Sequence, residues 1–211
     1  STGQTPVYVD CNAIAPDTVK GIGDTILAAG AEFIDAGIVG PPPHSGVPRV
    51  YASGKDLSPL DAIDGASLTI KKVGAEIGHA SAVKMCYASM TKGTLVLRTA
   101  MVTLAELLGV SEAIHAELES SQEGAWKSIN SVVPWYSMNA ARYVGEMEEI
   151  AKTYASAGLT PNFHKGAAEM YRLLASTPLA QESRENRDTS RTLQQAVEIY
   201  ADAARQKRAA E

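Results

Sequence analysis

The segment that decides the fold is residues 68–84, which read LTIKKVGAEIGHASAVK. Its first part, Leu68–Val73, is a strand candidate because apolar and β-branched side chains predominate. Gly74 and Gly78 then interrupt the chain, and residues 80–108 have the sequence of a helix that is apolar on most of its surface. Such a helix is expected to be buried, inside its own domain or against another subunit. Residues 74–78 are therefore the predicted join between two structural units.

Before the join, short apolar runs alternate with helix signals. Pro16-Asp17 opens a helix that ends at Gly30, and the three prolines within Gly40–Gly46 exclude the interior of a strand or helix. Strands are predicted at Val7–Cys11, which reads as short and buried, and at Ala31–Ala36, Arg49–Gly54 and Leu68–Val73, with helices at Thr18–Ala29 and Pro59–Ile63. This alternation predicts a sheet with crossover connections.

After the join, the chain is predicted to be helical throughout. Successive helices are separated at Gly109, Pro134, Gly158–Pro161 and Thr177-Pro178, and the last segment, Glu182–Glu211, is charged. Aromatic residues make up only 6% of the chain, which favours helices over a β-sandwich. We therefore expect an α/β domain at residues 1–75 and an all-α domain at residues 76–211, with mostly helical structure.

Composition and charge exclude several classes of function. The chain has 211 residues and a net charge of -5, with Lys and Arg spread along it, so no basic patch is expected to bind nucleic acid. Cys11, Cys86 and four scattered histidines show no metal-ligand or disulfide spacing, so no metal is predicted and a reducing cytoplasm is expected. The sequence has neither an apolar run of about 18 residues nor a signal-peptide pattern. Neither a membrane anchor nor export is expected.

Two short motifs raise the question of chemistry. Gly21-Ile22-Gly23 resembles part of a phosphate-binding turn, but the third glycine is missing and the segment lies inside a helix. We interpret it as small residues that pack a helix on a sheet. Lys84 follows small residues and is flanked by apolar ones, so partial desolvation favours a neutral amine suited to proton transfer. The alternative is a lysine whose ammonium reaches water from the end of a helix.

Four segments, which follow one another along the chain in the expected order, resemble motifs of one enzyme family. The spacing Gly78-x-x-x-x-x-Lys84, after a strand and before a long helix, resembles the catalytic-lysine motif of the β-hydroxyacid dehydrogenases, relatives of 3-hydroxyisobutyrate and 6-phosphogluconate dehydrogenases. Asp10–Pro16 resembles the strand-loop-helix motif that closes the family's nucleotide domain. Phe33–Gly40 resembles its substrate loop, and Gly46–Gly54 the glycine-bounded strand that follows. The helical tail is most similar to a phosphogluconate-dehydrogenase-like branch.

The resemblance implies a fold and a reaction. The fold would be a partial Rossmann-like sheet, with residues 1–75 as the C-terminal half of an NAD(P)-binding domain, followed by an all-α 6-phosphogluconate-dehydrogenase-like domain. The reaction would be hydride transfer between NAD or NADP and a small hydroxy acid or related carbonyl substrate, with Lys84 exchanging the hydroxyl proton. Asn12 and Ala13 would lie near the cofactor. Substrate contacts would come from Asn12, Gly37, Val39, Gly40, His44, Ser45 and Tyr87.

The sequence departs from the family pattern at several positions. Asn12 and Ala13 stand where Ser and Thr are usual, Val39 stands where the substrate loop carries Ser, and Tyr87-Ala88 replaces the asparagine that normally follows the catalytic lysine. The family's G-x-G-x-x-G turn and opening βαβ unit are not among these residues, so we expect the C-terminal part of a longer enzyme. The alternative is a non-catalytic helical dimerisation module with a vestigial sheet. The apolar helix after Lys84 implies a homodimer.

Overall fold

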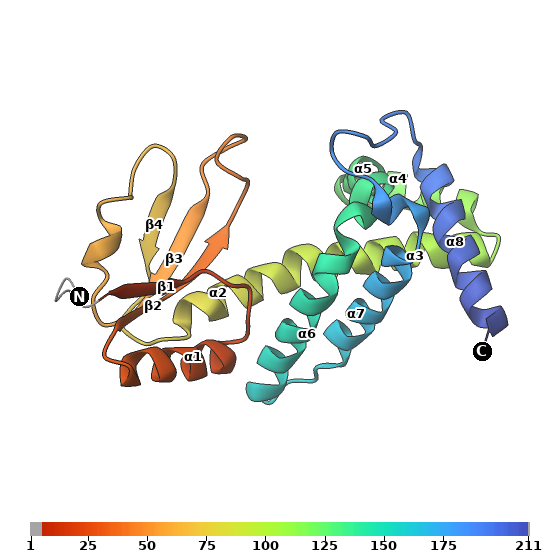
Figure 1. The fold of residues 1–211 in the computed structure, drawn as a ribbon. Coiled ribbons are helices and arrows are strands. Elements are labelled where there is room, and N and C mark those ends of the chain that lie inside the picture. Colours follow the sequence, from red (N-terminus) through yellow and green to blue (C-terminus); the bar gives the residue numbers. More distant parts are fainter. Residues whose placement is uncertain (1–5, 211) are drawn as a thin grey trace. The chain divides into compact units, whose positions relative to one another are not determined.

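The structure, a computed structural model, describes residues 6–210 and divides into two compact units (Figure 1). Unit 1 comprises the residues up to Met90 together with Glu149–Pro161, and unit 2 comprises Thr91–Glu148 and the residues from Asn162 onward. Residues 1–5 and 211, at the ends of the two predicted domains, lie outside the described residues. The boundary predicted at residue 75 precedes helix α2 (His79–Ala88), which belongs to unit 1.

Unit 1 contains a four-stranded mixed sheet whose strands lie side by side in chain order (Figure 1). The strands are β1 (Val7–Asp10), β2 (Glu32–Val39), β3 (Arg49–Ser53) and β4 (Thr69–Lys72). The pairs β1–β2 and β3–β4 are parallel, which confirms two crossover connections, but β2 and β3 are antiparallel. Residues 40–48 join β2 to β3, and they are too few for a crossover, which needs about a dozen residues.

Strand β1 differs from its prediction in burial. Val7, Tyr8 and Val9 are between 36% and 45% exposed, and Asp10 is buried. Within the described residues β1 pairs only with β2 and forms an edge of the sheet. The Tyr8 ring stacks on Phe33 of the neighbouring strand at 5.9 Å between ring centroids. The prediction of a short buried strand is therefore wrong about burial, because a strand at an edge has a neighbour on one side only.

Helix α1 (Pro16–Ala28) packs on β2 through a glycine. A Cβ atom added to Gly23 would lie 3.1 Å from the Phe33 ring and 3.3 Å from Ile77. The Gly21-Ile22-Gly23 segment lies inside α1, so its interpretation as a packing element is confirmed. A phosphate-binding turn would instead lie between a strand and a helix.

The two faces of β2 serve different neighbours, because alternate residues of a strand point to opposite sides. Phe33, Asp35 and Gly37 contact α1 and α2. Ile34 and Ala36 belong to the buried apolar cluster on the other face, which also contains Val50, Ala52, Leu60 and Ile70. Leu60 comes from a short 3-10 helix, η1 (Ser58–Leu60), which stands where a helix over 59–63 was predicted.

Unit 2 is helical, as predicted. Its elements are α3 (Thr94–Leu107), α4 (Ser111–Ser121), α5 (Glu123–Val132), η3 (Val133–Asn139), α6 (Ala140–Ser156, whose last residues belong to unit 1), α7 (Asn162–Ala175), η4 (Pro178–Gln181) and α8 (Leu193–Ala210). The charged last segment is a loop followed by α8. In residues 6–210 we find no helix that combines the length and the apolar character needed to cross a membrane.

The single helix predicted over residues 80–108 is interrupted by a five-residue π turn, η2 (Ser89–Gly93), between α2 and α3. In this turn the carbonyl oxygen of Lys92 accepts hydrogen bonds from the hydroxyls of Tyr171, at 2.9 Å, and Tyr136, at 3.3 Å. Burial raises the pKa of both hydroxyls, so they remain protonated donors. The Lys92 ammonium pairs with the carboxylate of Glu146. The two tyrosine hydroxyls thus supply hydrogen bonds to the Lys92 carbonyl oxygen in the π turn.

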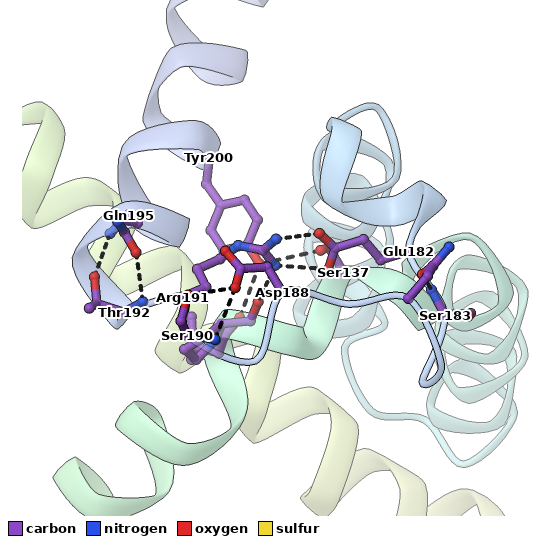
Figure 2. Close-up of polar contacts among 12 residues, drawn as sticks. Ser137, Glu182, Ser183, Asp188, Ser190, Arg191, Thr192, Gln195 and Tyr200 are labelled. Atoms are coloured by element: carbon purple, nitrogen blue, oxygen red, sulfur yellow. Dashed lines mark hydrogen bonds and ion pairs between the residues drawn. The ribbon is translucent and has the colours of Figure 1, made fainter.

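The loop between η4 and α8 is fixed by an arginine (Figure 2). The guanidinium of Arg191, whose side chain is 8% exposed, donates to the Glu182 carboxylate at 2.9 Å and to the carbonyl oxygen of Pro134 at 3.2 Å. The buried Tyr200 hydroxyl of α8 donates to the carbonyl oxygen of Val133 at 3.0 Å. Both contacts fasten α8 and the preceding loop to η3.

Helix α3 has an apolar face that the described chain leaves exposed. Leu97 and Leu104 of α3 and Leu108, the residue that caps its C-terminus, are 68%, 54% and 66% exposed, and their spacing of seven and four residues places them on one side of the helix. The prediction that this helix is buried on all sides within its own domain is therefore wrong. Burial against another subunit remains a prediction.

Candidate active site around Lys84

Lys84 lies on α2, and its amine is directed at the neighbouring strand. The Nζ atom donates a hydrogen bond to the carbonyl oxygen of Ile38 on β2. The residue is half-buried, which matches the partial desolvation expected from its neighbours. The amine is thus held at the backbone of β2.

The first turn of α2 is held by a buried carboxylate from the sheet. Asp35 is 0% exposed, and its Oδ2 accepts hydrogen bonds from the backbone N–H groups of Gly78, at 2.9 Å, and Ser81, at 3.0 Å. Its Oδ1 accepts from the Ser81 hydroxyl at 2.7 Å. The Ser53 hydroxyl donates to Oδ2 at 3.1 Å and accepts from the N–H of Ala80 at 3.1 Å. Strands β2 and β3 therefore supply the partners for the free N–H groups at the start of α2.

Gly37 allows α2 to approach β2 closely. A Cβ atom built on Gly37 would lie 2.9 Å from the carbonyl oxygen of Ala80 and 3.0 Å from the Cβ of Lys84. Both distances are shorter than ordinary contacts, so a side chain here would push the helix away from the strand. A substrate-binding role for Gly37 stays a prediction. What the structure places here is a buried contact between β2 and the backbone that carries Lys84.

The other predicted substrate residues lie at several places in unit 1. Val39 is buried at the end of β2, and Gly40 follows it with a positive φ of 111°. His44 and Ser45 lie on the exposed turn before β3, where the N–H of Ser45 donates to the carbonyl oxygen of Pro42 at 2.9 Å. Tyr87 lies on α2 and is 46% exposed. Among these residues, Gly37 lies against the Cβ atom of Lys84 and the carbonyl group of Ala80.

The predicted cofactor residues lie in the loop between β1 and α1. The backbone N–H of Asn12 donates to the carboxylate of Asp10 at 2.8 Å, and Ala13 is half-buried. The N–H of Ala15, at the start of α1, donates to the carboxylate of Glu149 at 2.8 Å. Burial raises the pKa of Glu149, but the hydrogen bonds from Lys152 and Ala15 lower it by a larger amount. The pKa of Glu149 is therefore below its usual value.

This loop does not fit a dinucleotide's pyrophosphate. Such a group is held by free N–H groups at a helix N-terminus after a glycine-rich turn. The loop Cys11–Ala15 contains no glycine, and the Glu149 carboxylate already occupies the N-terminus of α1. Within residues 6–210 no three His, Cys, Asp or Glu side chains gather as a metal site either.

Two groups of functional residues were not predicted from the sequence. Asp35, Ser53 and Ser81 form the network that holds α2, and Glu149 caps α1. Asp35 lies inside the Phe33–Gly40 segment that resembles the substrate loop. That resemblance is the one sequence feature that pointed to this residue. Its partners are 18, 43 and 46 positions away, so no local spacing indicated the network.

Comparison with solved structures identifies the class of fold. A conserved hypothetical protein from Sinorhizobium meliloti 1021 matches with a TM-score of 0.69 and 23% identity, over 93% of this chain and 66% of that one. MTH1747, a conserved protein of unknown function described as structurally similar to 3-hydroxyacid dehydrogenases, matches with a TM-score of 0.58 and 29% identity, over 80% and 65% of the two chains. The 3-hydroxyisobutyrate dehydrogenase of Mycobacterium tuberculosis matches with a TM-score of 0.54 and 17% identity, over 79% and 63%. The fold is that of 3-hydroxyacid-dehydrogenase-like proteins, as the resemblance predicted.

Sequence comparison adds a more particular relationship. Residues 105–174 match the family described as a domain of unknown function, DUF1932. An uncharacterized 28.5 kDa protein in the 7S RNA 5' region of Methanothermus fervidus is 25% identical over 167 residues, which are 79% of this chain and 65% of that protein. This chain thus spans about 65% of the length of the proteins it matches. Residues 105–174 are therefore similar to the DUF1932 domain, and the fold is similar to that of 3-hydroxyacid dehydrogenases.

Proposed function

We propose that the protein is an NAD(P)-dependent oxidoreductase in which this chain binds a small hydroxy acid, or the corresponding carbonyl compound, and exchanges the proton of the reacting oxygen. The observation that carries the proposal is the placement of Lys84. Its amine lies against the carbonyl oxygen of Ile38, on a helix whose first turn is fixed to β2 by Asp35. The similarity to 3-hydroxyacid-dehydrogenase-like folds supports the same class of reaction.

Lys84 acts in this proposal as the general acid and base at the substrate oxygen. In oxidation the neutral amine accepts the hydroxyl proton as the carbonyl bond forms, and in reduction the ammonium returns that proton to the oxygen. Lys84 is half-buried on α2, with its amine at the backbone of β2. The carbonyl oxygen of Ile38 accepts one of the amine hydrogens, so the nitrogen lies at the substrate-loop strand β2. Because the loop before α1 does not fit the pyrophosphate of a dinucleotide, the proposal is confined to this proton transfer.

The predicted substrate contacts are part of the proposal. Asn12, His44 and Ser45 are exposed polar residues that can donate hydrogen bonds to a carboxylate. Tyr87 presents a hydroxyl group one turn after Lys84. Gly37, Val39 and Gly40 would shape the end of β2 beneath these donors.

The test is the replacement of Lys84 in the full-length protein. Lys84→Ala should lower kcat/KM about 10²–10⁴-fold, the usual contribution of a positioned acid or base, in assays of small hydroxy acids with NAD and NADP. Lys71→Ala changes an exposed lysine of β4 and should leave turnover unchanged. Turnover of Lys84→Ala at the rate of the Lys71→Ala control would remove the proposed role.

We also propose that two copies of the chain associate through α3, because the exposed row of Leu97, Leu104 and Leu108 is an apolar surface of the kind that mediates association. This row equally supports the alternative function, a non-catalytic dimerisation module. Titration of the full-length protein with NADH and NADPH separates the two candidates. Failure to bind either nucleotide, in a protein that still dimerises, would favour the module.

A further inference from the structure

We propose that Asp35 is a positioning residue that sets where Lys84 stands relative to the substrate-loop strand β2. The inference rests on the proposed function for its catalytic consequence, but the placement itself is measurable without turnover. Asp35 does not act on the reacting atoms in this proposal. It acts through the first turn of α2.

The side chain that accepts hydrogen bonds from the first N–H groups of α2 belongs to strand β2 and not to the helix itself. Most helices satisfy their first N–H groups with the side chain of the N-cap residue. The N-cap of α2 is Gly78, which has no side chain and a φ of 103°. The capping carboxylate is Asp35, 43 residues earlier in the chain. A local cap only starts a helix, whereas a cap supplied by a strand also fixes the position of the helix on that strand.

The contacts of Asp35 are arranged to hold a buried charge. The carboxylate is 0% exposed, and a buried charge is costly unless it is fully hydrogen-bonded. Two N–H groups and two hydroxyls donate to it, and the positive end of the α2 dipole stabilises a negative charge at this position. Ser53 of β3 adds a third connection to α2, because its hydroxyl donates to the Asp35 carboxylate and accepts from the N–H of Ala80.

Three nearby residues of β2 contact α2 in the order in which the helix runs. Asp35 binds the first turn at Gly78 and Ser81. Gly37 lies against the Ala80 carbonyl and the Lys84 Cβ, and the carbonyl of Ile38 accepts from the Lys84 amine. The contact between β2 and α2 thus begins at the Asp35 carboxylate and ends at the Lys84 amine. A loosened anchor lets α2 shift along or rotate on the strand, and the amine moves with it.

The experiment follows the Lys84 amine directly. Lysines of the full-length protein are reductively methylated with ¹³C-formaldehyde, and the Lys84 resonance is identified by its loss in Lys84→Arg. In the unchanged protein this resonance should differ from those of exposed lysines such as Lys71. In Asp35→Asn it should move toward the exposed-lysine position. Asp64→Asn is the matched control, since Asp64 also accepts a backbone N–H, from Ile70 at 2.9 Å, but does not hold α2.

Kinetics give the second readout. Asp35→Asn should lower kcat by about 10²-fold, the order expected for a misplacement near 1 Å, with KM close to that of the unchanged protein. Asp35→Glu should restore part of the loss because the charge returns with a longer side chain. If Asp35→Asn does not fold, Ser53→Ala and Ser81→Ala carry the test, because each removes one hydroxyl contact and should shift the same resonance by a smaller amount.

The outcomes separate the two proposals. An unchanged Lys84 resonance in folded Asp35→Asn, or in both serine variants, overturns the positioning role even when Lys84→Ala is inactive. A shifted resonance in a protein whose Lys84→Ala variant turns over normally keeps the positioning of the amine and overturns the proposed function instead.

Discussion

Replacing Gly37 with alanine should destabilise the protein, because the added methyl group meets the backbone of α2. It would lie 2.9 Å from the carbonyl oxygen of Ala80 and 3.0 Å from the Cβ of Lys84. To restore ordinary contact the helix has to move by about half an ångström, against the hydrogen bonds that Asp35 makes to its first turn. Overpacking of this kind costs about 1–3 kcal/mol.

The measurement is thermal unfolding followed by circular dichroism. For a chain of this length Gly37→Ala should lower Tm by at least about 2 °C. Gly21→Ala is the matched control: Gly21 lies in α1 with no atom within 4 Å of its Cβ position, so alanine should stabilise the helix by about 0.5–1 kcal/mol. A Tm for Gly37→Ala that equals or exceeds that of the unchanged protein would refute the packing argument.

Two further predictions follow from single hydrogen bonds, and a third from the exposed leucines of α3. Glu149→Gln should cost about 1–2 kcal/mol at neutral pH because a charged acceptor for the Ala15 N–H is lost. Since the folded-state pKa of Glu149 is lowered, its contribution is present above the ordinary carboxyl pKa and is lost as the pH falls through the lowered value; a Tm difference from Glu149→Gln that persists undiminished at pH 2 would contradict this. Tyr200→Phe should cost about 1 kcal/mol in denaturant unfolding, since a buried carbonyl oxygen of η3 loses its donor, and equal midpoints would count against that contact. Leu97→Glu with Leu104→Glu should shift the sedimentation coefficient to that of a monomer, whereas an unchanged dimer would place the interface elsewhere.

Local patterns predicted most of the elements. Pro16 and Gly30 bracket α1, the apolar runs place three strands to within a residue or two, and the break at Gly109 ends α3. Strand direction was predicted less well. The antiparallel pairing of β2 and β3 depends on the length of the connection at residues 40–48, which an alternating pattern of strands and helices does not encode.

The candidate site was predicted in part. The spacing from Gly78 to Lys84 indicated the lysine, and the structure shows what holds it: a carbonyl group at Ile38 and a close contact at Gly37. Asp35 could not be predicted from its surroundings in the sequence. Its hydrogen bonds form only when β2, β3 and α2 come together, so its role depends on tertiary structure and not on local sequence.

The central claim is that the Lys84 amine transfers the proton of the reacting oxygen. It is tested most directly by adding small alkylamines to Lys84→Ala in the full-length protein. The account predicts that turnover, lost in this variant, returns in proportion to the concentration of the added amine. Full turnover of Lys84→Ala without any amine, or a lost turnover that amines do not restore, would contradict it.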